Sequence, residues 1–228
     1  MKVRRKPFVA CAAMAATAVL SACSGGASST TSQPANPAAD KAAAIKINLR
    51  PSDFPTGWTS APHQPSAQEA ATLQQLTQCV GIPDLAGHTT AMERSLDFSA
   101  GQTTSANSNV TFVKTAADAS NDLAAFQSAK TPDCLKQTVV ALVRQQLPGA
   151  TPANLDVRQL QFPTLKDGTA AYQASFTISA AGTNLPVYAD FIYFRSGRAE
   201  IALVTINAGS PFDPKLEQQL AKNMAARS

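Results

Sequence analysis

The side chains of this sequence that could carry out catalysis are few and far apart. Its two histidines, His63 and His88, fall in loop-like stretches, and we expect both to be exposed loop residues. A serine hydrolase would need one of them beside a nucleophile, and the sequence has no Gly-x-Ser-x-Gly turn to present such a serine. The glutamates are scattered, with no pairing that suggests a glycosidase. These observations predict a protein that is not an enzyme and has no catalytic residues.

Sequence patterns for cofactors, metals and nucleic acids are also missing. We find no HExxH helix, EF-hand loop, Walker loop or glycine-rich dinucleotide loop, and therefore expect no cofactor and no bound metal. The chain of 228 residues has 19 Lys and Arg against 15 Asp and Glu. Four of the positive residues (Lys2, Arg4, Arg5 and Lys6) lie in a segment that we expect to be removed, which leaves a neutral protein. A neutral domain without a basic stripe binds phosphates poorly, so we expect no nucleic-acid partner.

The first 22 residues have the three parts of an export signal. A basic start is followed by an apolar run over residues 8–20, which is too short for a membrane span of about 20 residues. The run leads into Leu20-Ser21-Ala22-Cys23, which resembles the bacterial lipobox. That resemblance implies diacylglyceryl transfer to Cys23, cleavage before it and often acylation of its new amine. We therefore expect a protein anchored by lipid to the outer face of the cell membrane; the alternative is a plain secretory signal with a chance cysteine.

Three segments follow from this interpretation. Residues 1–22 are the lipoprotein signal peptide, and residues 23–44 are the lipidated cysteine plus a flexible tether of small and polar residues. Residues 45–228 form a single extracytoplasmic domain. Because Cys11 leaves with the signal and Cys23 carries lipid, the exported domain keeps Cys79 and Cys134. Such a pair normally oxidises outside the cytosol, so we predict a disulfide between them.

The pattern of residues 45–228 predicts an α+β fold. Capping signals and apolar spacing indicate helices that begin near residues 66, 115, 131 and 213. Strands are expected over residues 92–100, 105–114, 155–162, 170–180, 187–195 and 199–207. Residues 45–49 could form a short strand or a helical turn. Since short turns join the strands, we expect a single, mainly antiparallel sheet of about 5–7 strands packed with about 3–4 helices, an α/β sandwich.

The strand at 187–195 is apolar on both sides, which indicates a central strand covered on both faces. Helices on both faces would explain this pattern, and so would one face that lines a hydrophobic cleft. In the second case the candidate ligand-lining residues are aromatic or aliphatic: Tyr188, Phe191, Ile192, Tyr193 and Phe194. Asp190 in mid-strand could pair with Arg195 or Arg198, or sit at a polar spot of a pocket. Trp58 is expected to plug one end of the core rather than form a recognition lip.

Several short motifs carry a resemblance to known families. They are Asp53-Phe54-Pro55-Thr56-Gly57-Trp58, Phe112-Val113 followed by Thr115-Ala116-Ala117-Asp118-Ala119, and Cys134 late in the helical stretch. With the lipobox and the Ala/Thr-rich composition, they make the chain similar to actinobacterial, mycobacterial-type cell-envelope lipoproteins. The folded part resembles the PsbP-like lipoproteins and the extracellular sensor domains of PknH-type kinases. The resemblance implies a non-enzymatic α/β sandwich that binds or senses something outside the cell.

Three hypotheses for the function follow. The first is a lipid-anchored, non-catalytic binding or sensing module, whose ligand would be an apolar or amphipathic envelope molecule. The second is a structural or accessory subunit that docks onto another envelope protein, and the third is an unrecognised hydrolase. A cavity of several hundred Å³ would favour the first and a flat exposed apolar patch the second. Two carboxylates, or a histidine and a serine, meeting in a cleft would favour the third.

Overall fold

The structure is a computed structural model that describes residues 35–228, except residues 83, 148–149 and 181–182. These residues belong to one compact unit, Ser32–Ser228. The expected signal peptide and Cys23 lie outside the described residues. Within them, eight strands form one antiparallel sheet, accompanied by six α-helices. The expected α+β class and single antiparallel sheet are confirmed, although strands and helices are both more numerous than the sequence predicted.

The N-terminal half of the described chain contains two of the larger helices and the strands of one sheet edge. Its elements are α1 (Pro37–Ile47), η1 (Pro51–Asp53), β1 (Thr59–Ala61), α2 (Ala67–Val80), α3 (Leu85–His88), β2 (Thr89–Arg94), β3 (Asp97–Ala100) and β4 (Thr104–Val113). The C-terminal half contributes the longest strands. Its elements are α4 (Ala116–Phe126), α5 (Thr131–Gln146), β5 (Ala153–Gln159), β6 (Thr169–Ala180), β7 (Thr183–Ser196), β8 (Ala199–Ala208) and α6 (Pro214–Arg227).

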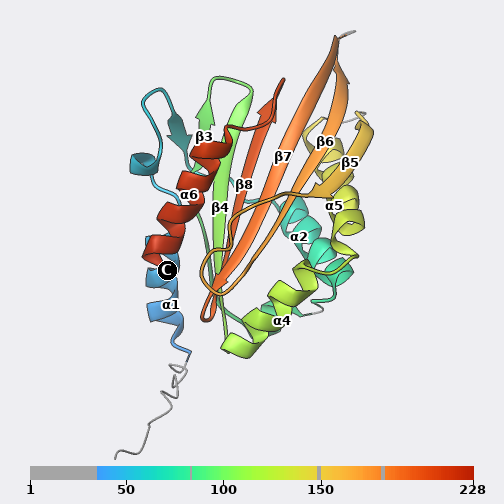
Figure 1. Cartoon of the computed structure of the whole chain (residues 1–228). Helices are drawn as coiled ribbons and strands as arrows, with labels where there is room; N and C mark the ends of the chain where they lie inside the picture. The colour runs from blue at the N-terminus through green and yellow to red at the C-terminus, as the bar shows by residue number, and fades with distance from the viewer. Residues whose placement is uncertain (1–34, 83, 148–149, 181–182) are drawn as a thin grey trace, which may run out of the picture. The chain divides into compact units, whose positions relative to one another are not determined.

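The sheet follows the order β1-β3-β4-β8-β7-β6-β5, and β2 also pairs with β4 (Figure 1). Every strand pair is antiparallel. Short turns join β3 to β4 and β7 to β8, whereas β4 and β8 pair although they lie far apart in the sequence. β7 lies between β6 and β8, which confirms that the strand apolar on both sides is an interior strand.

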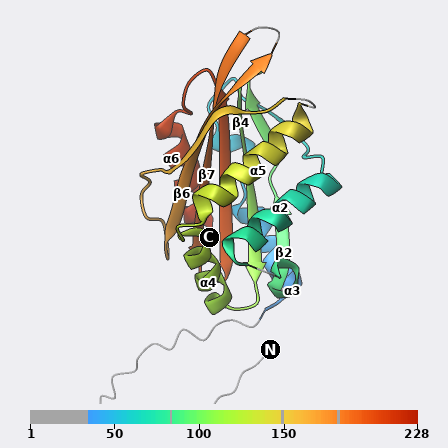
Figure 2. The same ribbon diagram turned by 90° about the vertical axis from the view of Figure 1, so that its right-hand side faces the viewer.

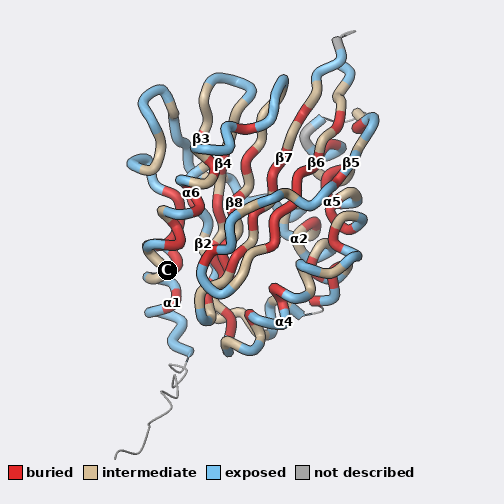
Figure 3. Tube along the Cα trace, in the orientation of Figure 1, coloured by how far each residue is buried: buried red, intermediate tan, exposed pale blue. Residues whose placement is uncertain are grey.

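Helices cover both faces of the sheet, which explains why β7 has apolar side chains on both of its sides (Figures 1 and 2). Helices α1 and α6 pack on one face, which we call the α6 face. Helices α2, α4 and α5 lie over the other, which we call the α5 face. The α6 face contains the larger core: Val110, Ile192, Phe194, Ile201, Leu203, Leu220 and Met224. Buried residues follow the middle strands and the inner sides of the helices in Figure 3.

Helix α1 begins before residue 45, where we expected the folded domain to start. It begins at Pro37, and the Asn36 side chain caps it by accepting a hydrogen bond from the Ala39 amide at 3.2 Å. Asp40 and Ala44 are buried, and the helix packs on β2 and β4. Residues 37–44 therefore belong to the folded domain rather than to a tether. Small, alanine-rich residues indicated a tether, but alanine also favours helix once tertiary contacts support it.

The stretch expected as one strand over residues 92–100 forms parts of two strands, β2 and β3. Both pair with the same edge of β4, and Ser95 and Leu96 separate them. The very short elements β1 and α3 were not predicted. Thr131 was expected to cap α5, but the cap position is Lys130 and the Thr131 hydroxyl donates instead to the Ala125 carbonyl at 3.3 Å.

Trp58 packs onto the α6-face core, as the sequence predicted. Its ring centroid lies 4.6 Å from that of Phe54 and 6.0 Å from that of Phe212. Phe54 in turn stacks on Phe98 at 4.3 Å. These aromatic contacts close one end of the core.

Candidate functional site

A cavity of about 400 Å³ lies between the sheet and helices α2 and α5. Strands β4, β8, β7 and β6 contribute its floor, and the two helices contribute its roof. Most of the lining is apolar, with large side chains from both layers that include Leu73, Leu76, Phe126, Leu135, Leu142 and Phe191. The volume is within the range of pockets that hold small organic ligands.

The cavity opens between the first half of α2 and strand β2. The exposed lining residues gather there: Ser66 and Ala70 on the helix side, Met92 and Arg94 on the strand side. Arg94 is paired with Glu69 of α2, so this ion pair crosses the opening. An ion pair therefore lies at the mouth, while the interior is mostly apolar.

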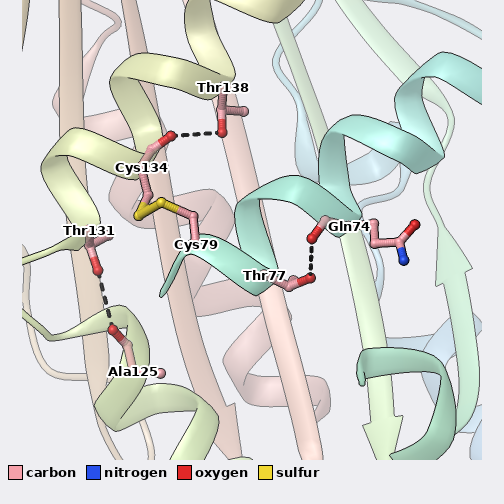
Figure 4. Close-up of a disulfide and its surroundings, with 7 residues drawn as sticks. All are labelled: Gln74, Thr77, Cys79, Ala125, Thr131, Cys134 and Thr138. Carbon is pink, nitrogen blue, oxygen red and sulfur yellow. Dashed lines mark hydrogen bonds between the residues drawn. A yellow bond between two sulfur atoms is a disulfide. The ribbon is translucent and has the colours of Figure 1, made fainter. Parts of the chain in front are cut away.

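The disulfide between Cys79 and Cys134 is confirmed, and Figure 4 shows it joining the end of α2 to the start of α5. Its surroundings are buried: Val80 and Ile82 pack around Cys134. The bond therefore ties together the two helices that roof the cavity. A loop of 55 residues closed in this way corresponds to roughly 4 kcal/mol of stability in the chain-entropy treatment.

The five candidate ligand-lining residues divide between the two faces of β7. Phe191 and Tyr193 line the cavity, and the Tyr193 ring packs on Phe126 with centroids 4.5 Å apart. Ile192 borders the cavity but its side chain belongs to the α6-face core, together with Phe194. Tyr188 is half-buried and lies outside the cavity lining. The alternation of side chains along a strand produces this division, since only every second residue can face the cavity.

Three residues of the cavity floor have buried polar atoms without a hydrogen-bond partner among the described residues. They are Asn109 Oδ1, the Tyr193 hydroxyl and Glu200 Oε1. Glu200 lies close to both Tyr193 and Asp122, but no hydrogen bond of normal geometry joins these atoms to either neighbour. In the strand register, Ala202 lies directly between Asn109 and Tyr193, and Glu200 is two residues away from Ala202 on the same face of β8. Neighbouring strands are about 4.8 Å apart, so the three polar groups occupy one small area of the floor.

Burial keeps two of these floor residues, Tyr193 and Glu200, neutral. Burial, with the nearby Asp122 carboxylate as a further cause, raises the pKa of Glu200 to about 9. Burial and the neighbouring Glu200 also raise the pKa of the Tyr193 hydroxyl well above its usual value. At neutral pH Glu200 is therefore a protonated acid that can both donate and accept a hydrogen bond.

His63 lies in the loop before α2, as expected, but the expected exposure is wrong for both histidines. His88 ends helix α3, and its Nε2 lies 3.0 Å from Asp122 Oδ2. His63 Nδ1 lies 3.0 Å from Asp97 Oδ2, and its Nε2 lies 2.9 Å from Glu69 Oε2. Only 18% of the His63 side chain and 22% of the His88 side chain are exposed.

His63 and Ser66 both line the mouth, which was the arrangement that would favour a hydrolase. Both nitrogens of His63, however, face carboxylates. The Ser66 oxygen accepts from the amide of Glu69 at 3.1 Å and from the Gln145 side chain at 3.2 Å. Ser66 thus caps helix α2, and His63 links that helix to strand β3.

Asp190 does not pair with Arg195 or Arg198, which the sequence had offered as partners. It lies on the α6 face, outside the cavity. Arg195 is paired with Asp167 and Arg198 with Asp40. Asp190 instead lies by Gln173 and by Glu217 of α6, and burial raises the pKa of Asp190. Burial, with Asp190 as a further cause, also raises the pKa of Glu217 to about 8. These two carboxyl groups meet in a core under a helix rather than in a cleft.

Within residues 35–228, apart from the undescribed gaps, no group of three or more His, Cys, Asp or Glu side chains could hold a metal ion. None of the helices in this part is long and apolar enough to span a membrane.

Comparisons with known proteins found structural neighbours only. No protein-family model matches the chain, and no curated protein is significantly similar in sequence. The extracellular domain of PknH from Mycobacterium tuberculosis has a TM-score of 0.45 at 12% identity, covering 86% of this chain and 98% of its own. LpqN, involved in cell envelope biogenesis of the same organism, has a TM-score of 0.30 at 12% identity, covering 76% and 78%.

A third neighbour is PA94 from Pseudomonas aeruginosa, a protein of unknown function, with a TM-score of 0.23 at 15% identity, covering 60% of this chain and 80% of its own. The first two neighbours are an extracellular domain and an envelope protein of a mycobacterium. The sequence motifs indicated a resemblance to the extracellular sensor domains of PknH-type kinases, and the PknH extracellular domain is among the structural neighbours found. At these identities and TM-scores, none of the neighbours transfers a function to this chain.

Proposed function

We propose that this protein is a lipid-anchored, non-catalytic binding module of the cell envelope that holds an amphipathic or apolar molecule. The observation that carries this proposal is the cavity of about 400 Å³ between the sheet and helices α2 and α5. Its lining is mostly apolar, which suits the hydrocarbon or ring part of a small ligand. The Arg94–Glu69 ion pair lies at its mouth, which suits a ligand that has both polar and apolar parts.

The anchoring half of the proposal rests on the sequence. Leu20-Ser21-Ala22-Cys23 follows an apolar run that is too short to span a bilayer. Two or more acyl chains on Cys23 would hold the protein stably at the outer face of the membrane, where one chain alone would bind marginally.

The alternative of a docking subunit has less support. Five large apolar side chains are exposed in the described residues: Ile45 of α1, Met92 of β2, Leu96, Leu147, and Leu185 of β7. A docking surface would need such residues to gather in one patch of several hundred Å².

Filling the cavity tests the proposal. Ala202 lies on the floor, so Ala202→Phe places a ring in the space that a ligand would occupy. We expect this variant to abolish the fluorescence increase of the apolar dye N-phenylnaphthylamine that the unmodified protein gives. The matched control is Ala208→Phe, which lies on the same strand and the same side but outside the lining.

Thermal melts of both variants would identify any loss of folding. Equal dye binding by the unmodified protein and a folded Ala202→Phe variant would contradict the proposal, and so would the lack of any dye binding by the unmodified protein. The protein for these measurements can begin at residue 32, because the compact unit Ser32–Ser228 contains the whole of the described core.

A further inference from the structure

Several polar atoms on the cavity floor have no hydrogen-bond partner in the part of the protein that the structure describes. A ligand that fills the cavity should therefore offer hydrogen-bonding groups at the floor. Across the described residues, six buried side-chain oxygen or nitrogen atoms have no hydrogen-bond partner. Three of them belong to residues that line this one cavity: Asn109, Tyr193 and Glu200. Buried polar groups in native proteins are nearly always hydrogen-bonded, so three exceptions in one place need an explanation.

The strand register brings these three residues close together on one face of the sheet. Asn109 of β4 and Tyr193 of β7 flank Ala202 of β8 in one row of the sheet, and Glu200 lies in the next row on the same side. The small Ala202 side chain leaves space between the three larger ones. A ligand group placed over Ala202 is therefore within reach of three hydrogen-bonding partners from adjacent strands.

The charges around this area favour a neutral ligand group. The two cationic candidates in the lining are engaged elsewhere, since Arg94 pairs with Glu69 and both His63 nitrogens face carboxylates. Arg195 lies opposite Glu200 in the strand register, but it pairs with Asp167. The buried Asp122 carboxylate lies near Glu200, which would repel an anion. A cation would require the buried Glu200 to ionise in largely apolar surroundings, which is unfavourable.

We propose, on the basis of the binding function proposed above, that the floor of the cavity binds a neutral hydroxyl or amide group of an amphipathic ligand through Asn109, Tyr193 and Glu200. The hydroxyl of Tyr193 and the acid of Glu200 can each donate or accept, and the Asn109 amide oxygen accepts. The apolar part of the ligand then lies along Leu73 and Leu76 of α2 toward the mouth. The ligand enters with its neutral polar group first.

Four probes with the same hydrocarbon chain test the inference: decane, decanol, decanoate and decylamine. Each would compete with N-phenylnaphthylamine for the chain that begins at residue 32. We expect decanol to bind at least about tenfold more tightly than the other three, because it alone forms hydrogen bonds without burying a charge. Higher affinity for decanoate or decylamine would overturn the inference, and equal affinity of decane and decanol would do the same.

Single substitutions of floor residues test whether these residues cause the preference for decanol. Tyr193→Phe and Asn109→Leu each remove a polar group at nearly constant volume, and we expect each to weaken decanol binding about fivefold while decane binding is unchanged. Tyr188→Phe makes the same chemical change on the other side of β7 and should alter neither. If decanol loses no affinity in the first two variants, water rather than a ligand satisfies the floor and the inference is wrong. If no probe and no dye binds the unmodified protein, the proposed function fails as well.

Discussion

Each face of the sheet buries a glutamic acid that keeps its proton at neutral pH. On the α5 face, burial is the main reason that the pKa of Glu200 rises to about 9. On the α6 face, burial is the main reason that the pKa of Glu217 rises to about 8, although a hydrogen bond from Thr205 at 2.6 Å acts in the opposite direction. Both residues therefore serve as neutral hydrogen-bonding groups inside the fold.

These raised pKa values predict that the protein becomes less stable as the pH rises. In the unfolded chain each glutamate loses its proton near its ordinary value of 4.5, whereas the folded protein holds the proton up to about 8 or about 9. Between those values the folded state binds more protons than the unfolded state. The free energy of unfolding therefore falls with rising pH, by up to about 1.4 kcal/mol per pH unit for each group. Urea unfolding at several pH values between about 5 and about 8 measures this slope.

The double variant Glu200→Gln, Glu217→Gln tests the origin of the slope. Glutamine keeps the shape of the neutral acid and cannot ionise, so we expect the fall in stability with pH to become much shallower. The control is Asp133→Asn, which removes a carboxylate from an exposed side chain and should leave the slope as it is. A double variant as pH-dependent as the unmodified protein would contradict the assignment.

The sequence could not predict this chemistry, because the partners of each group lie far along the chain. Asp97 and His63 are 34 residues apart, and so are Asp122 and His88. Asp190 and Glu217 meet only because α6 folds back over β7. Local spacing indicates which side chains share a face of an element, but ionisation depends on burial and on distant neighbours. Both histidines were therefore assigned to exposed loops.

Elements with a strong local signal were predicted from the sequence. The helix starts near residues 66 and 115, the strand over residues 170–180 and the interior position of the strand at 187–195 all occur in the structure. Short or weakly patterned elements were missed. Helix α1 has no clear apolar stripe, and its position depends on tertiary contacts: Asp40 binds Arg198 of the β7–β8 hairpin, with oxygen–nitrogen distances of 2.5 and 3.0 Å.

Helix α1 should therefore contribute measurably to stability through this buried ion pair. Burial opposes the charge on Asp40, but the hydrogen bonds from Arg198 and Thr90 outweigh that effect and lower the pKa of Asp40. Asp40→Asn leaves the nearly buried Arg198 without its carboxylate partner, and we expect a loss of about 3 kcal/mol in the free energy of unfolding. Chemical denaturation of the chain that begins at residue 32 measures it.

The neighbouring residue provides the control for this prediction. The Lys41 ammonium group lies 3.4 Å from Glu93, but 63% of its side chain is exposed. An exposed ion pair contributes about 1 kcal/mol at most, so Lys41→Gln should cost much less than Asp40→Asn. Similar losses in the two variants would mean that α1 is not held by the Arg198 contact.

At the scale of the whole molecule, the two faces of the sheet have different roles. The α6 face, where α1 packs, is filled by large side chains such as Phe98 and Phe194. The α5 face encloses the cavity, and its roof is held by the disulfide. Strand alternation predicted that some residues of β7 would face a cleft if one existed. Which face would open could not be predicted, because that depends on how the long helices α2 and α5 sit over the sheet.

The lipobox interpretation of residues 20–23 predicts how the 228-residue chain is processed in the cell. In the lipobox interpretation Cys23 is both the lipid acceptor and the marker for cleavage, so Cys23→Ala should abolish labelling by a fatty-acid probe. The variant should appear as an unprocessed or released protein. Cys11→Ala is the matched control, because Cys11 lies inside the signal and should not affect labelling. Label that persists on Cys23→Ala would place the anchor elsewhere, and a lack of label on the unmodified protein would leave a plain secretory signal as the explanation of residues 1–22.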